Sequence, residues 1–366
     1  MTSTVTFRPE KTIPFKDCIG LGVATVLKVL LMFSILERAK NQDAVGNLFK
    51  RVARTGTDVD IVFGKISTAG DVCWYRYPHS EQDGVGGFHR LLEFTTQSFF
   101  DPPNGTFAFD TSLTRSLRLG FRYVWTQMFR QTSNPFSPTA ESTNGQILKW
   151  KALDPAAVAS LLAVARSEGV TLNTLLLQRL DQEMRRFTLH SNRTHSWMIP
   201  VNLRGRVPGP GRYSNRVSFV AVDIKPDSSL QELHSQVMDR LNSGWHWFFW
   251  HAIQLSSAIP KSILDWIIRG HMKVAQTNTA AFSNLGRWPR VSGDPSQAWI
   301  FAPPVAKAIP VTIGCVTYDE TMTVAIHCHP TSGLKENQLV AILNSIAPEG
   351  QNTRLQVDLS RRGSLS

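Results

Sequence analysis

The chain has little cysteine, and no arrangement of it that indicates a disulfide framework or a zinc site. Its 366 residues include four cysteines, and none of them forms a Cys-x-x-Cys pair. No segment has the pattern of a cleaved secretory signal, so we expect free thiols in a reducing, cytoplasmic compartment. His327 and His329 share one face of a predicted strand, but a structural zinc site uses four ligands. No metal is therefore predicted.

Runs of basic residues are also missing, although the chain is basic as a whole. Lys and Arg number 39 against 28 Asp and Glu, which gives a formal net charge of +11. Such a charge favours anionic partners, among them nucleic acid, acidic lipid and phosphorylated cofactors such as coenzyme A. The basic side chains are scattered, without zinc-finger spacing, an RNA-recognition signature or a basic-aromatic ladder. We therefore expect no nucleic-acid partner.

An uninterrupted apolar run long enough to cross a bilayer is absent as well. The most apolar stretch, 18–36 (CIGLGVATVLKVLLMFSIL), carries Lys28 at its middle. A central lysine costs about 2.5–3.5 kcal/mol on insertion, which favours a buried or membrane-surface helix over a span. Residues 245–250 (WHWFFW) suit either a packed core helix or contact with a membrane surface or an acyl chain. These features are compatible with peripheral contact with a membrane. We expect the protein to be a monomer.

Strand and helix patterns alternate along the chain, which predicts an α/β fold. The polar segment 131–145, rich in Ser, Thr, Asn and Pro, is the predicted linker. It would divide an N-terminal subdomain (1–130) from a C-terminal one (146–348), and 349–366 would be a disordered tail. The predicted strands are 59–62, 72–77, 196–202, 216–224, 311–317 and 322–327; the predicted helices include 17–40, 47–54, 112–130, 155–168, 171–187, 229–242, 260–274 and 335–346.

The candidate catalytic residues lie in a loop that joins a predicted strand to a predicted helix. His79 and Asp83 lie in the loop, followed by Gly84, which permits backbone angles that a side chain would forbid. An imidazole with an ordinary pKa near 6.5 can accept a proton from a hydroxyl or an amine at neutral pH. Asp83 can fold back to hold the loop or pair with an arginine. The alternative is an ordinary surface histidine in a turn.

Five further short motifs follow this loop along the chain. They are Thr171-Leu-Asn-Thr174, Pro200-Val-Asn-Leu-Arg204, Ser214-Asn-Arg216, Ser283-Asn-Leu-Gly286 and Thr317-Tyr-Asp-Glu320. Together with Pro78-His-Ser-Glu-Gln-Asp-Gly84 they resemble, in order, motifs of the CoA-dependent acyltransferase superfamily. That superfamily includes chloramphenicol acetyltransferase, condensation domains, alcohol acyltransferases and the wax ester synthase/diacylglycerol acyltransferase group. The resemblance covers about residues 72–347. Pro78 replaces the first histidine of the family's HHxxxDG motif, and the N-terminal subdomain is shortened.

The resemblance implies two chloramphenicol-acetyltransferase-like subdomains, built on mixed sheets covered by helices, with a channel between them. His79 would be the general base in that channel, and Asp83 would orient its loop, with Arg204 as a candidate ion-pair partner. The acceptor would be a lipid-like alcohol, with acyl-CoA as co-substrate and no bound cofactor. One alternative is transfer to an amine or to a carrier-bound acceptor. The other is a catalytically silent protein that binds lipid or acts as a scaffold. The implied substrate-binding residues are Gly84, Asn202, Asn215, Ser283 and Asn284. The neighbourhood of Asn215, or that of Ser283 and Asn284, is the candidate source of hydrogen-bond donors for the oxyanion.

Overall fold

The computed structural model describes residues 43–55, 57–99, 101–105, 118–120, 136, 145–256, 260–265, 278–292, 294, 296–347 and the backbone of 355–357. The predicted helix at 17–40, most of the predicted helix at 112–130 and most of the predicted linker lie outside these residues. So does most of the tail that is predicted to be disordered, but its residues Leu355–Val357 form a short strand, β10. β10 pairs with the strand that opens the C-terminal part of the chain.

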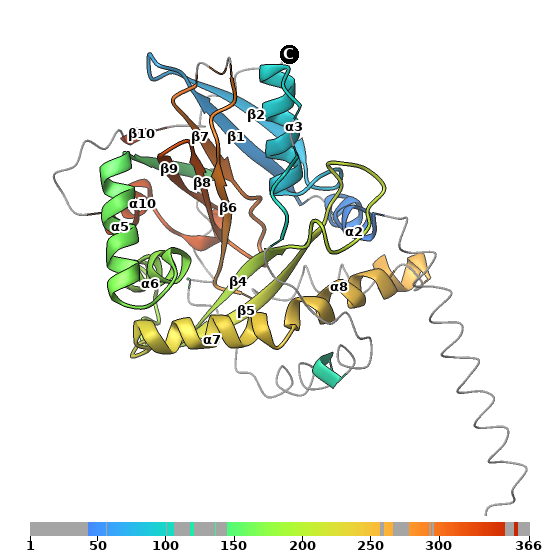
Figure 1. Ribbon diagram of the computed structural model, residues 1–366. Coiled ribbons are helices and arrows are strands. Elements are labelled where there is room, and N and C mark those ends of the chain that lie inside the picture. Colours follow the sequence, from blue (N-terminus) through green and yellow to red (C-terminus); the bar gives the residue numbers. More distant parts are fainter. Residues whose placement is uncertain are drawn as a thin grey trace, which may run out of the picture.

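The larger of the two β-sheets is mixed and has seven strands (Figure 1). Its strand order is β10-β3-β9-β8-β6-β4-β5. β6 runs parallel to both β4 and β8, and the other neighbours pair antiparallel. The remaining strands are β3 (Ile147–Leu153), β4 (His195–Asn202), β5 (Val217–Ile224), β6 (Ala280–Trp288), β8 (Val311–Tyr318) and β9 (Thr321–Cys328).

Helices cover this sheet, and side chains at their first turns explain where they begin. α5 (Pro155–Ser167) and α10 (Glu336–Asn344) pack on β3 and β9, with α6 (Leu172–Arg185) beside them, whereas α7 (Leu230–Asn242) and α8 (Trp245–Ser256) pack on β5. The Asp154 side chain accepts a hydrogen bond from the N–H of Ala157 at 2.7 Å, which caps α5. Ser229 and Glu232 form a capping box at the start of α7. These starts agree with the predicted helices.

A smaller antiparallel sheet has the order β2-β1-β7. β1 (Asp60–Ile66) and β2 (Val72–Pro78) confirm the two strands predicted near the N-terminus, and α3 (Gly84–Thr96) packs on β1. β7 (Ala298–Ala302) comes from the C-terminal part of the chain. All of its residues are buried, and it pairs with β1 while packing against β8 and β9. A cut at the predicted linker therefore does not separate the two sheets.

The aromatic segment 245–250 lies in the core. Trp245, Trp247, Phe249 and Trp250 are buried on α8 within the largest hydrophobic cluster. The structure therefore supports the packed-core interpretation of this segment over an exposed membrane-contacting patch. Within the described residues, no helix combines the length and apolar character that crossing a bilayer requires.

Candidate active site

The His79 loop leaves the end of β2 and enters α3, as the sequence predicts. The register of the small sheet pairs Pro78 with Asp60 on β1, and the backbone N–H of His79 donates to the carbonyl oxygen of Val59 at 3.2 Å. His79 is thus held at the last rung of an antiparallel ladder. Its position is set by a rigid strand end rather than by a mobile surface turn.

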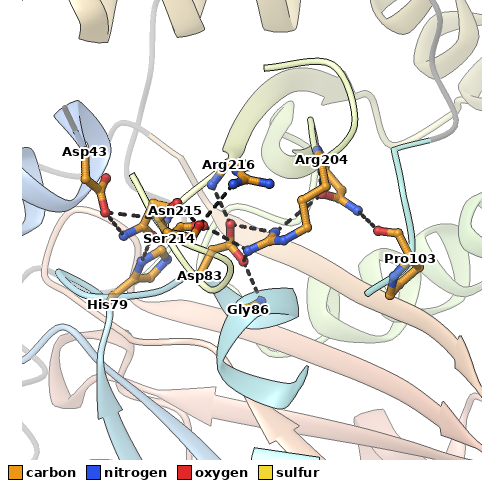
Figure 2. Close-up of polar contacts among 11 residues, drawn as sticks. Asp43, His79, Asp83, Gly86, Pro103, Arg204, Ser214, Asn215 and Arg216 are labelled. Atoms are coloured by element: carbon orange, nitrogen blue, oxygen red, sulfur yellow. Dashed lines mark hydrogen bonds and ion pairs between the residues drawn. The ribbon is translucent and has the colours of Figure 1, made fainter. Parts of the chain in front are cut away.

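The side chain of Asp83 is buried and joins the start of α3 to the segment that carries Arg204 and Arg216. Its carboxylate caps α3 by accepting the N–H of Gly86 at 2.8 Å. Arg204 Nη1 and Nη2 each lie 2.8 Å from a carboxylate oxygen of Asp83, and the N–H of Arg216 donates to Oδ2 at 2.7 Å. Figure 2 shows these contacts converging on Asp83. The ion pair that the sequence suggested between Asp83 and Arg204 is present, and both side chains are at most 2% exposed.

A second acidic side chain of α3 holds the same connecting segment. The Tyr213 hydroxyl donates to Glu93, and Arg212 Nη2 lies 3.1 Å from Glu93 Oε1. The connection between β4 and β5 is therefore tied to both ends of α3. This double attachment places Asn215 beside the His79 loop.

The imidazole of His79 has two close neighbours besides its own loop. Its Nδ1 lies 3.1 Å from Oδ1 of Asn215. The Phe49 ring stacks on the imidazole with a centroid separation of 3.8 Å and an interplanar angle of 19°. The Nδ2 and backbone N–H of Asn215 in turn lie 3.2 and 3.4 Å from Oδ2 of Asp43 (Figure 2).

The surroundings of His79 favour the neutral ring. Burial lowers its pKa from the ordinary value of 6.5, because desolvation penalises the charged form. The carbonyl oxygen of His79 itself, the charges of Asp83 and Asp43, and the hydrogen bond to Asn215 oppose this shift without reversing it. At neutral pH the imidazole is therefore uncharged and able to accept a proton.

Helix α2 (Ala44–Ala53) supplies two groups that sequence reasoning missed, Asp43 and Phe49. Asp43 caps this helix by accepting the N–H of Gly46 at 2.6 Å. A Cβ added at Gly46 would lie 2.3 Å from the carbonyl oxygen of Ser80, so the helix approaches the His79 loop closely. The sequence signal for this helix start is an aspartate three residues before a glycine, whereas the predicted helix begins at Asn47.

The other predicted site residues lie in different surroundings. Asn202 Oδ1 accepts the backbone N–H of Arg204 at 3.0 Å, and its Nδ2 donates to the carbonyl of Pro103 at 2.9 Å. Asn202 therefore shapes the start of the segment that carries Arg204. A Cβ added at Gly84 would lie 2.9 Å from side-chain carbons of Leu285 and Phe301. Gly84 thus allows close apolar packing at the start of α3.

The Ser283-Asn284 pair makes no hydrogen bond to His79 in the part of the chain that the structure describes. Asn284 Nδ2 donates to Oδ1 of Asn173 at 2.7 Å, and its Oδ1 accepts the N–H of Gly286 at 2.8 Å. The first of these bonds links β6 to the first turn of α6, within the Thr171–Thr174 motif. A role of Ser283 and Asn284 toward an oxyanion stays a prediction.

Neither a family model nor a curated protein matches the sequence. Solved structures match in fold. The trichothecene 15-O-acetyltransferase of Fusarium sporotrichioides superposes with a TM-score of 0.51 and 13% identity, over 78% of this chain and 69% of that one. The epimerization domain from the third module of tyrocidine synthetase B gives 0.47 and 14%, over 75% and 66%. The wax ester synthase/diacylglycerol acyltransferase of Marinobacter aquaeolei VT8 gives 0.45 and 12%, over 75% and 66%.

The chain spans about two thirds of the length of these structures. It shares its fold with the 15-O-acetyltransferase, in agreement with the α/β fold class that its motifs indicate.

Proposed function

We propose that the protein transfers an acyl group from acyl-CoA to the hydroxyl of an alcohol, with His79 as the general base. One observation carries the proposal. His79 is held at a strand end with Nδ1 engaged by Asn215, whereas its Nε2 makes no hydrogen bond within the described residues. A ring nitrogen in that state can bind the proton of an incoming hydroxyl.

The proposed reaction begins at Nε2 of His79. Nε2 takes the hydroxyl proton as the acceptor oxygen attacks the thioester carbonyl carbon. The carbonyl oxygen becomes an oxyanion, for which the neighbourhood of Asn215, or that of Ser283 and Asn284, is the candidate source of donors. When the carbon–sulfur bond breaks, the imidazolium returns its proton to the departing thiolate, which leaves an ester, free CoA and neutral His79.

The proposed donor is acyl-CoA and the proposed acceptor is an alcohol. The net charge of +11 suits a donor that carries several phosphates. An alcohol acceptor is inferred from the 15-O-acetyltransferase that shares the fold. A lipid-like alcohol is our preferred acceptor, and amines or carrier-bound acyl acceptors are the alternatives from the same fold.

The test is CoA release from a panel of acyl-CoAs with alcohols, amines and carrier-bound acceptors. His79→Ala should lower turnover by about 10²–10⁴-fold, the usual worth of a positioned base. His190→Ala removes a histidine from the turn after α6 and serves as the matched control, with turnover unchanged. Turnover that survives in His79→Ala would exclude His79 as the base. Acyl-CoA binding without turnover for every acceptor would overturn the proposal in favour of a silent lipid-binding protein.

A further inference from the structure

We propose that Asp43 is a positioning residue that fixes the tautomer of His79 through the side chain of Asn215. The inference rests on the proposed function for its catalytic meaning, because the tautomer decides which ring nitrogen can act as the base. Asp43, Asn215 and His79 come from three separate parts of the chain: the start of α2, the segment before β5 and the loop after β2.

The first step is the orientation of the Asn215 amide. A carboxylate can only accept hydrogen bonds. Asp43 Oδ1 is occupied by the N–H of Gly46 at 2.6 Å, and Oδ2 faces Asn215. Both Asn215 atoms within reach of Oδ2 are nitrogens, the backbone N at 3.4 Å and Nδ2 at 3.2 Å. The charge of Asp43 therefore selects the amide orientation in which Nδ2 points toward Asp43 and Oδ1 toward His79.

The second step is the proton on the imidazole. Asn215 Oδ1 lies 3.1 Å from His79 Nδ1, and a carbonyl oxygen can only accept. Nδ1 must therefore carry the hydrogen, which leaves the lone pair on Nε2. The Phe49 ring, stacked at 3.8 Å, covers one face of the imidazole and restrains the ring plane. The result is a base whose reactive nitrogen is chosen by an aspartate that does not touch it.

A competing determinant lies in the His79 loop itself. The carbonyl oxygen of His79 interacts with its own ring, and it too would favour a hydrogen on the nitrogen that faces it. Asp43 matters only if the amide of Asn215 outweighs this carbonyl. A test therefore has to invert the Asn215 amide while leaving the His79 backbone in place.

Asp43→Asn makes that inversion. An asparagine caps a helix as well as an aspartate does, so α2 keeps its first turn. The atom that replaces Oδ2 is now an NH₂ donor facing the two donors of Asn215. Rotation of the Asn215 amide by half a turn relieves this conflict, and it presents NH₂ to His79 Nδ1. Nδ1 must then accept, so the hydrogen moves to Nε2 and the base is lost.

The measurement is NMR of the imidazole nitrogens in the full-length protein labelled with ¹⁵N-histidine. The His79 signals are assigned from their loss in His79→Gln. We expect Nδ1–H in the parent chain and Nε2–H in Asp43→Asn. Asp154→Asn makes the same chemical change at the N-cap of α5 and should leave His79 in the Nδ1–H form. If His79 keeps Nδ1–H in Asp43→Asn, the proposal is overturned and the loop carbonyl is the determinant.

The tautomer is read without substrate, so this result does not depend on whether acyl transfer is confirmed. Where turnover is measurable, the wrong tautomer should lower kcat by up to about 10⁴-fold, as it does in a serine protease whose orienting aspartate is replaced. KM should change little, because Asp43 does not touch a substrate. A loss of turnover with an unchanged tautomer would also contradict the proposal, since Asp43 would then act by another route.

Discussion

At the scale of single residues, several imidazole rings are kept neutral by burial. The pKa values of His246 and His327 fall from 6.5 to about 4, and that of His79 is also lowered, because desolvation disfavours the charged ring. His327 lies between the carbonyl oxygen of Pro303, 2.9 Å from Nδ1, and the side chain of Gln146, 3.0 Å from Nε2. It is a buried histidine on β9 with both ring nitrogens hydrogen-bonded.

These histidines predict a loss of stability in mild acid. The unfolded chain binds a proton on each ring near pH 6.5, whereas folded His246 and His327 remain neutral until about pH 4. The unfolded state thus binds more protons between these values, so the free energy of unfolding falls as the pH is lowered through this window. The full loss is about 3 kcal/mol per ring at about 1.4 kcal/mol per pKa unit. Urea unfolding between pH 7 and pH 5 measures the upper part of it.

His327→Gln provides the control for this prediction. Glutamine keeps a donor and an acceptor at the site but cannot titrate, so the decline between pH 7 and pH 5 should be shallower than in the parent chain. If the free energy of unfolding declined equally steeply in the variant, His327 would not be the ring that stays neutral in the folded state.

At the scale of elements, the ion pair between Asp83 and Arg204 joins α3 to the connection between β4 and β5. Arg204 is 1% exposed and also donates to the carbonyl oxygen of Ser214 at 3.0 Å. Arg204→Met should lower the free energy of unfolding by about 3–5 kcal/mol, because it leaves the Asp83 charge buried without its partner. Chemical denaturation of the full chain measures the change.

The matched control is an ion pair of similar length at the surface. Arg76 Nη2 lies 2.6 Å from Asp58 Oδ2, with the two side chains 45% and 38% exposed. Arg76→Met should cost less than about 1 kcal/mol, since solvent screens both charges. Equal losses in the two variants would mean that burial does not set the strength of the Asp83 pair.

Among these elements, the sequence identified the strand, loop and helix around His79 and suggested Arg204 as the partner of Asp83. The strand, loop and helix follow from local residue patterns, whereas Arg204 was suggested by the resemblance of the Pro200–Arg204 segment to a family motif. The sequence did not identify Asp43 or Phe49. Asp43 is the N-cap, and Phe49 a residue, of a helix that the sequence predicts to begin at Asn47 rather than at Ala44, and no local pattern ties that helix to a loop some 30 residues away.

At the scale of the whole molecule, β7 connects the two sheets. It pairs with β1 through the register of Phe63 with Phe301, and it also packs against β8. A Cβ added at Gly314 on β8 would lie only 2.0 Å from the backbone oxygen of Phe301. Glycine at this position therefore permits the close approach of β8 to β7.

Gly314→Ala should accordingly destabilise the protein by at least about 1–3 kcal/mol, the usual cost of overpacking, because the atom it meets is backbone and cannot rotate away. Gly145→Ala is the control, since a Cβ there meets nothing within 4 Å, and it should change stability by less than about 0.5 kcal/mol. Thermal unfolding of both variants checks the difference. A Gly314→Ala variant as stable as the control would show that the contact between β7 and β8 can relax.

The sequence by itself determined the α/β class, most helices and strands, and the loop that carries His79 and Asp83. Each of these depends on capping residues, periodicity or turn residues within a few positions of one another. Only the tertiary structure decided that β7 completes the N-terminal sheet, that 245–250 is core, and that Asp43 reaches His79 through Asn215. Those outcomes depend on contacts between segments 30 to more than 200 residues apart, and such contacts leave no local pattern in a single chain.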